Sequence, residues 1–278
     1  MPMITAQDGT PLFIKDWGDA VSTSPTIILI HGWPLNSDSW EYQAVRLAEE
    51  GYRVISYDRR GFGRSGQPWS GYNYDMLSDD LAAVIESLGL SDVTLVGFSM
   101  AGGEILRFMN RHNGHKVARV ALVSSIAPFL LKTDDNPDGA PEDVFEGMKQ
   151  NLRKDRQGFL QDFFKDFYGQ GTEGGGVSQG QLDWSFQMAM MASPKATLDC
   201  VDAFGKTDLR GDLEFMTKPT LVIHGTADAT VPIEPTAHQV VKHVEGATLK
   251  EYEGAPHGIP ATHADRLFDD LLEFIKTT

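Results

Sequence analysis

Short, continuous apolar runs constrain the fold of this chain more than any other feature of its sequence. One of them, residues 26–30 (TIILI), shows no alternation of apolar and polar side chains and is rich in β-branched residues. A half-buried strand alternates, so this run predicts a strand buried on both faces, as in a parallel sheet. Similar runs occupy residues 53–57, 94–96, 117–123, 220–223 and 248–252, and a hairpin across Asp8-Gly9 is expected at residues 4–6 and 12–17.

Helical patterns separate these strand-like runs. They cover residues 40–50, 74–88, 100–112, 233–244 and 264–276. Gly51 and Gly89 follow the first two, and glycine is common just after the C-terminus of a helix. Alternating strands and helices predict an α/β fold, with a mostly parallel sheet and helices on both of its faces.

Residues 130–213 interrupt this alternation and contain no clear strand pattern. A loop rich in Pro, Gly and Asp (KTDDNPDGAP) leads to helical patterns at 142–151, 157–168, 181–191 and 194–204, with a glycine-rich link (GQGTEGGG) after the second. Because strand-like segments resume at residue 220, we interpret 130–213 as a helical cap inserted between sheet strands. The core domain then comprises 1–129 and 214–278, and a separate helical domain is the alternative.

Charge and cysteine content exclude several classes of protein. The formal net charge is −15 and Lys and Arg do not cluster, so nucleic-acid binding is not expected. Cys200 is the only cysteine and cannot form an internal disulfide; we expect an unreactive small side chain there. The first residues lack the pattern of a secretory signal, and no apolar run approaches the about 20 residues that span a bilayer. We therefore expect a cytoplasmic protein without a membrane partner.

The segment Gly97-Phe98-Ser99-Met100-Ala101 joins a predicted strand to a predicted helix. A serine on so sharp a turn presents its hydroxyl at the top of the sheet, and the residues two positions away on either side must be small. Gly97 and Ala101 meet this requirement, although the usual pattern has glycine at both positions. An ordinary tight turn is the alternative; otherwise Ser99 is a candidate nucleophile.

A serine hydroxyl is a weak nucleophile and needs a base that a carboxylate orients. In α/β enzymes of this kind the chain order is serine, acid, histidine. Asp228 follows the strand at 220–223, and His257 lies in a Gly/Pro loop after the last strand, so both belong to the edge of the sheet where ligands bind. Taken singly, Asp228 could cap a helix and His257 could be an ordinary loop histidine. Their joint order predicts a Ser99–His257–Asp228 triad.

The negative oxygen that forms during attack on a carbonyl needs hydrogen-bond donors. We expect the main-chain N–H groups of Met100, directly after the serine, and of Trp33, in the loop after residues 26–30. The positive end of the helix that follows Ser99 also stabilises the negative oxygen. The indole of Trp33 either lines the acyl pocket or packs in the core.

Two other sequence patterns indicate that the chain binds neither a dinucleotide nor a metal ion. Residues 61–66 spell G-x-G-x-x-G after a strand, but Gln-Pro-Trp follows where a dinucleotide site needs a helix. The eight histidines show no spacing typical of a metal site. His31 and His224, each beside a glycine at a strand end, are expected to be structural. We therefore expect no nucleotide, metal or organic cofactor.

Several segments of the sequence form a combined pattern: His31-Gly32-Trp33-Pro34, Tyr57-Asp58-Arg59-Arg60-Gly61-Phe62-Gly63-Arg64-Ser65, Gly97-Phe98-Ser99-Met100-Ala101-Gly102-Gly103-Glu104, His224-Gly225 with Asp228, and His257-Gly258. Together these motifs resemble the α/β-hydrolases known as cofactor-free (non-haem) haloperoxidases, arylesterases and perhydrolases, and the likeness runs nearly end to end. In that group the elbow usually has glycine where Ala101 stands, and the insertion is a helical cap that begins near Leu131-Lys132-Thr133. The resemblance implies the same oxyanion donors, no cofactor and frequent homo-oligomers.

From these residues and this resemblance we expect a serine carboxylesterase or arylesterase that cleaves small esters through an acyl-enzyme. Perhydrolase (haloperoxidase) activity or γ-lactam hydrolysis at the same site are alternatives, and a non-catalytic ligand receptor on the same scaffold is a third. Phe and Met side chains of the cap could line an apolar pocket, although at helical spacing they more commonly form core. The pocket residues we expect are Trp33, Phe129, Phe163, Met190 and Ile259.

Overall fold

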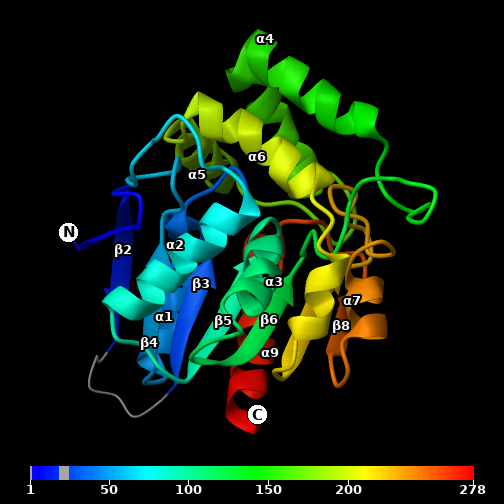
Figure 1. Ribbon diagram of the computed structural model, residues 1–278. Coiled ribbons are helices and arrows are strands. Elements are labelled where there is room, and N and C mark those ends of the chain that lie inside the picture. Colours follow the sequence, from blue (N-terminus) through cyan, green and yellow to red (C-terminus); the bar gives the residue numbers. More distant parts are fainter. Residues whose placement is uncertain (1, 19–24) are drawn as a thin grey trace.

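An eight-stranded sheet forms the centre of the computed structural model, which describes residues 2–18 and 25–278 (Figure 1). The strand order is β1-β2-β4-β3-β5-β6-β7-β8. β2 pairs antiparallel with β1 and β4, and all other neighbours are parallel. The strands are β1 (Met3–Thr5), β2 (Pro11–Trp17), β3 (Thr26–Ile30), β4 (Arg53–Tyr57), β5 (Val93–Phe98), β6 (Val117–Val123), β7 (Thr220–Gly225) and β8 (Thr248–Tyr252).

The apolar runs of the sequence become the central strands, which confirms the α/β prediction. Every residue of β3 is buried, as expected for a strand covered on both faces. β5 extends two residues beyond the expected 94–96 at its C-terminal end, because Gly97 and Phe98 still pair with Leu122 and Val123 of β6. The strand therefore continues to the residue before Ser99.

Helices cover both faces of the sheet, with α2 and α3 on one and α1 and α9 on the other (Figure 1). α9 shows why: its buried residues, Leu267, Phe268, Leu271, Phe274 and Ile275, follow helical spacing and form one apolar stripe. The core helices are α1 (Glu41–Glu49), α2 (Tyr74–Ser87), α3 (Ala101–Arg111), α7 (Ala237–His243), α8 (Ile259–Thr262) and α9 (Ala264–Thr277), with 3-10 turns η1 (Ser37–Trp40) and η2 (Arg210–Phe215).

One core helix starts later than the sequence pattern predicts. We expected it from residue 233, but α7 begins at Ala237. Pro235 explains the difference, because proline has no N–H to donate and disfavours helical dihedrals in the residue before it. The residues before α7 instead form a turn, in which the Thr236 hydroxyl donates to the Pro232 carbonyl.

Three helices lie above the carboxyl edge of the sheet: α4 (Glu142–Phe167), α5 (Gln179–Met190) and α6 (Pro194–Lys206) (Figure 1). The chain leaves the sheet after β6 and returns in the neighbouring strand β7. α4 joins two expected helices into one bent element. At the bend, Asp155 is non-helical (φ −156°, ψ 85°), and its carboxylate accepts the Gly158 N–H as an N-cap would.

Candidate active site

Ser99 occupies a strained turn between β5 and α3. Its φ of +56° lies in the left-handed region that non-glycine residues seldom adopt. The turn is crowded: a Cβ added to Gly97 would lie 2.6 Å from Cδ1 of Ile105 and 3.1 Å from the main chain of Ala101. A larger residue at position 97 would force Ile105 and the start of α3 to shift, so the turn favours glycine there. Ala101 is the first residue of α3, and its helical backbone accommodates a methyl group.

The side chains of Ser99, His257 and Asp228 meet at the carboxyl edge of the sheet. Nε2 of His257 lies 2.9 Å from Oγ of Ser99, and Nδ1 of His257 lies 2.7 Å from Oδ2 of Asp228. All three residues are buried. The arrangement places an imidazole in line between a hydroxyl and a carboxylate, which is the geometry that activates a serine.

Asp228 is held as a carboxylate by donors on both of its oxygens. Oδ1 accepts the main-chain N–H groups of Thr230 (3.0 Å) and Val231 (2.8 Å), while Oδ2 faces His257 and, at 3.3 Å, Nε2 of His224. Burial by itself would raise the pKa of Asp228. The charge of His257 and the hydrogen bonds from the two histidines outweigh burial and lower the pKa to about 2. The group therefore stays ionised at neutral pH.

Two aromatic rings enclose the imidazole of His257. The ring of Phe98, at the end of β5, lies 5.3 Å from it at an angle of 32°, and the ring of Phe167, at the end of α4, lies 4.8 Å away at 81°. The main-chain carbonyl of Phe167 also accepts the N–H of Gly258 at 2.9 Å. From the sequence, Phe167 was one of the Phe and Met side chains of the cap that could line a pocket, but nothing in a helical Phe pattern shows which ring meets the distant loop of His257.

The loop after β3 runs directly beside Ser99. A Cβ added to Gly32 would lie 2.9 Å from Cδ1 of Phe98 and 3.1 Å from Cβ of Ser99, so a larger residue would push these side chains away and glycine suits this close approach. In the part of the chain that the structure describes, the main-chain N–H groups of Trp33 and Met100 donate to no protein acceptor. Met100 precedes the first residue of α3, so its N–H also lies at the positive end of that helix. Two unpaired donors thus flank the serine.

A cavity of about 440 Å³ opens beside Ser99 and His257, below the helices of the insertion. Trp33 forms part of its wall, with its ring 5.3 Å from that of Phe163 and 5.6 Å from that of Phe204. The indole N–H donates to the Thr197 carbonyl at 3.1 Å and so fixes the ring. The wall is largely apolar, with Ile126, Leu130, Val144, Phe145, Met148, Phe159 and Val231 also exposed to the cavity.

Of the pocket residues expected from the sequence, Trp33 and Phe163 line this cavity, whereas Phe129, Met190 and Ile259 do not. Phe129 borders a second cavity, of about 490 Å³, where the Arg210 guanidinium lies 4.9 Å from its ring. Ile259 is fully buried at the start of α8, and Met190 packs against the hydrophobic core at the end of α5. The expectation was wrong for these three residues because the sequence pattern does not show in which direction each side chain points.

Other polar groups singled out in the sequence are buried in structural contacts. Burial raises the pKa of the Cys200 thiol to about 12, so it stays protonated at neutral pH. Burial and the nearby charge of Arg59 lower the pKa of His31 to about 3. In the G-x-G-x-x-G segment, the Gly66 N–H donates to the Pro11 carbonyl at 2.8 Å, and the next helix begins only at Tyr74. This loop lacks the helix N-terminus that a dinucleotide site uses.

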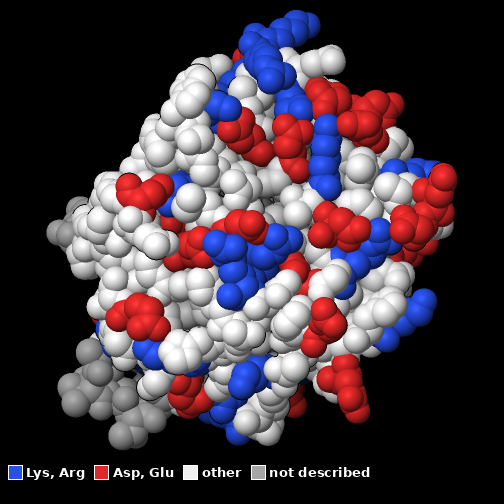
Figure 2. Space-filling model, in the orientation of Figure 1, with Lys and Arg blue, Asp and Glu red and all other residues white. Residues whose placement is uncertain are grey.

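Within residues 2–18 and 25–278, no group of three or more His, Cys, Asp or Glu side chains is arranged to hold a metal ion. Over the same residues, the structure contains no helix of the length and apolarity needed to cross a bilayer. On the face shown in Figure 2, Asp and Glu side chains are interspersed with Lys and Arg, without a broad basic patch. This face offers no surface typical of nucleic-acid binding.

Comparison with known proteins places this geometry in context. The sequence pattern of the family described as "alpha/beta hydrolase fold" matches residues 25–264. The chain is 41% identical over 278 residues to a non-heme chloroperoxidase of Kitasatospora aureofaciens, covering 99% of this chain and 100% of the relative. It is 39% identical over 279 residues to a bifunctional esterase/perhydrolase of Acinetobacter calcoaceticus, covering 100% of both. Among solved structures, a bromoperoxidase from Bacillus anthracis superposes with a TM-score of 0.93 at 43% identity, over 99% of each chain.

Proposed function

Since this chain belongs to the α/β-hydrolase fold family, we propose that it is a serine esterase that cleaves small aryl or alkyl carboxylic esters through an acyl-enzyme on Ser99. The observation that carries the proposal is the 2.9 Å contact between Oγ of Ser99 and Nε2 of His257, with Asp228 bound to the other ring nitrogen. The relative named as an esterase/perhydrolase supports ester chemistry at this site.

In the first half of the reaction, Oγ of Ser99 attacks the ester carbonyl while Nε2 of His257 takes its proton. Asp228 stabilises the imidazolium that forms and holds its other nitrogen in place. The N–H groups of Trp33 and Met100 receive the negative oxygen of the tetrahedral intermediate. His257 then gives its proton to the departing alcohol, and the acyl group remains on Ser99.

In the second half, water takes the place of the alcohol. His257 removes a proton from the water as it attacks the acyl carbon, and the same two N–H groups hold the second tetrahedral oxygen. Collapse returns the proton to Oγ of Ser99 and releases the carboxylic acid. The proton transfers between Ser99 and His257 in this scheme use side chains already within hydrogen-bond distance of each other, and Asp228 is bound to the other ring nitrogen.

The segment 130–213 acts in this proposal as a cap over the site. It supplies Phe163 and Phe204, which close the cavity around Trp33. An apolar cavity of about 440 Å³ is suited to a small ester, since it removes the acyl or alcohol group from water while leaving the carbonyl beside Ser99.

A second activity at the same site is favoured by the names of the relatives, which include a perhydrolase. Hydrogen peroxide would replace water in the second half of the reaction. One peroxide oxygen attacks the acyl carbon, His257 accepts the proton, and the peracid leaves as Oγ of Ser99 regains its hydrogen. No oxidation or reduction occurs in this step, because the O–O bond stays intact.

The test is a series of p-nitrophenyl esters of graded acyl length, assayed with the wild type, with Ser99→Ala and with the exposed control Ser70→Ala. We expect Ser99→Ala to lower kcat by about 10⁴- to 10⁶-fold with an unchanged fold, and Ser70→Ala to retain full activity. Peracid formation is measured in parallel with added hydrogen peroxide. Full activity of Ser99→Ala, or no turnover of any ester by the wild type, contradicts the proposal; the latter result favours a ligand receptor.

A further inference from the structure

His31 is a fully buried histidine that the proposed reaction does not use. Its Nε2 lies 3.0 Å from the main-chain nitrogen of Arg59, and its Nδ1 lies 2.9 Å from the main-chain oxygen of Gly32. An N–H can only donate and a carbonyl can only accept. Nε2 of His31 must therefore be the unprotonated nitrogen, and Nδ1 must carry the hydrogen that it donates to Gly32.

The carbonyl of Gly32 and the N–H of Trp33 belong to one peptide group. This peptide is trans, because the cis bonds of the described residues are Trp33–Pro34 and Ala127–Pro128. In a trans peptide the carbonyl and the N–H point in opposite directions. His31 Nδ1 and the N–H of Leu35, at 3.0 Å, both hold the carbonyl on one side. The N–H of Trp33 is thereby directed to the other side.

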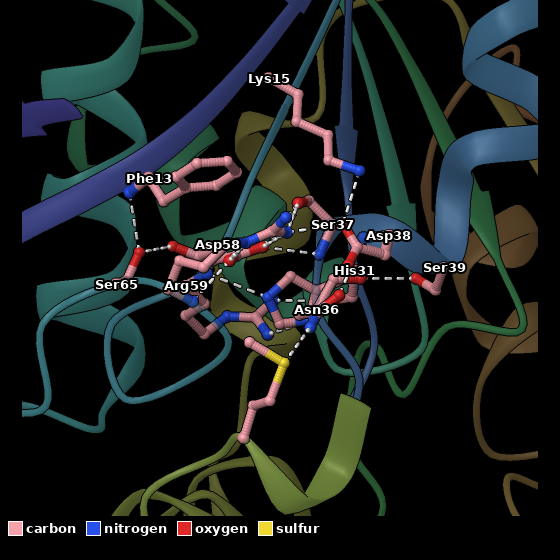
Figure 3. A network of polar contacts seen from close by, with 12 residues as sticks. Phe13, Lys15, His31, Asn36, Ser37, Asp38, Ser39, Asp58, Arg59 and Ser65 are labelled. Atoms are coloured by element: carbon pink, nitrogen blue, oxygen red, sulfur yellow. Dashed lines mark hydrogen bonds and ion pairs between the residues drawn. The ribbon is translucent and has the colours of Figure 1, made fainter. Parts of the chain in front are cut away.

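Arg59 ties this loop to the helix that carries the second donor. Its Nη2 donates to the His31 carbonyl at 2.8 Å, and its Nε donates to Oε2 of Glu104 at 2.8 Å. The side chains of Arg59 and Glu104 are both fully buried. Glu104 lies in the first turn of α3, the helix that begins directly after Met100. Figure 3 shows His31 and Arg59 side by side in the polar network at the ends of β3 and β4.

We propose that His31 and Arg59 are positioning residues for the oxyanion site. His31 sets the orientation of the Trp33 N–H. Arg59, by binding Glu104 of α3, sets the distance between the Trp33 N–H and the Met100 N–H. The inference rests on the proposed function, since it concerns how the same two N–H groups receive the tetrahedral oxygen. Neither side chain touches the substrate, so both act through the peptide groups that they hold.

Two substitutions at position 31 separate the two hydrogen bonds of the ring. The amide nitrogen of Asn lies near the position of Nδ1, so His31→Asn keeps the donor to Gly32. The amide oxygen of Gln lies near the position of Nε2, so His31→Gln keeps only the acceptor for Arg59. We expect His31→Gln to lower kcat by about 10- to 100-fold while KM changes by less than about twofold, and His31→Asn to retain most of kcat.

A boronic acid that adds to Ser99 provides a readout that a purely structural role would not change. Its tetrahedral oxygen occupies the position of the oxyanion, whereas the carboxylate product binds without forming that group. We expect the affinity of His31→Gln for the boronic acid to fall by the same factor as kcat/KM, and its affinity for the product to stay nearly constant. Arg59→Lys, which keeps the charge beside Glu104 but loses the donor to His31, serves as a second variant should His31→Gln fail to fold.

Arg60 provides the matched control. It follows Arg59 directly, is equally buried and pairs with Asp80 at 2.6 Å, away from the oxyanion loop. Arg60→Met should lower stability without changing boronic acid affinity. The inference is overturned if folded His31→Gln and Arg59→Lys keep wild-type kcat and boronic acid affinity, or if Arg60→Met weakens that affinity equally. If Ser99→Ala is inactive while the inference on His31 and Arg59 is overturned, the esterase proposal itself is still supported.

Discussion

Oδ2 of Asp228 lies 2.7 Å from Nδ1 of His257, although 29 residues and a whole strand separate them in the chain. The parallel arrangement of β7 and β8 explains the contact, since the loops after neighbouring parallel strands leave the sheet at the same edge. β5 brings Ser99 to this edge as well. The parallel strands of the sheet therefore bring the three residues of the candidate site together.

Asp228→Asn should leave the fold intact and lower kcat by about 10³- to 10⁴-fold. The amide nitrogen of Asn donates to Nδ1 of His257 and favours the hydrogen on Nε2, where it blocks acceptance of the Ser99 proton. Asp212→Asn is the matched control, because Asp212 is also buried, pairs with Arg107 at 2.8 Å and does not line the cavity beside Ser99. Steady-state kinetics and thermal denaturation of both variants check the prediction; equal losses of kcat would contradict it.

The free energy of unfolding should fall as the solution is acidified, in part because of His31. The folded-state pKa of His31 is about 3, whereas an unfolded histidine has a pKa of about 6.5. Between these values the unfolded chain binds a proton that the folded chain does not, so acid favours unfolding. The contribution lost between about pH 7 and pH 5 is about 2 kcal/mol. Urea denaturation of the wild type and His31→Asn should give curves that converge in acid; parallel curves would exclude this cause.

Phe167 should matter for the reaction as well as for packing, because its ring contacts His257. We expect Phe167→Leu and Phe164→Leu to lose similar stability, about 1–3 kcal/mol, since both side chains are buried in α4. Only Phe167→Leu should also lower kcat, by about tenfold, since the imidazole is then held less firmly against Ser99. Thermal denaturation and ester kinetics separate the two effects. A drop in kcat of the same size in Phe164→Leu would refute this specific role.

Phe163 should limit the length of the substrate, because its ring closes the cavity beside Trp33. In Phe163→Ala, the ratio of kcat/KM for a p-nitrophenyl octanoate over the acetate should rise by about tenfold. Phe129→Ala, at the second cavity, should leave this ratio unchanged. If the ratio changes in Phe129→Ala, or does not change in Phe163→Ala, the acyl group does not bind beside Phe163.

Much of the fold was predictable because it depends on local patterns. Buried parallel strands read as unbroken apolar runs, and the crowded turn at Ser99 demands a small residue at Gly97. The side chains of Asp228 and His257 could be placed at the same edge of the sheet from their order and their position after strands. These inferences need only the direction of the chain and the spacing of its elements.

Other features depend on how segments distant in sequence pack together, and the sequence did not reveal them. The ring of Phe129 points toward Arg210 and a second cavity, although its position in the chain is next to the insertion. His31 was expected to be structural, but the sequence did not reveal that its ring accepts the main-chain N–H of Arg59, which comes from a neighbouring strand end. Side-chain direction and partner choice are set by tertiary packing, which a single sequence does not encode in any local pattern.

The proposed reaction requires that Ser99 becomes covalently acylated, and the mass of the enzyme during turnover shows whether it does. A p-nitrophenyl ester is mixed with the enzyme, quenched in acid within the burst of p-nitrophenol release, and the protein and its peptides are measured by mass spectrometry. We expect a mass increase equal to one acyl group minus one hydrogen, on the peptide that contains Ser99, and no increase in Ser99→Ala. An acyl group on any other residue, or steady turnover with no acylated protein at any time, would contradict the account.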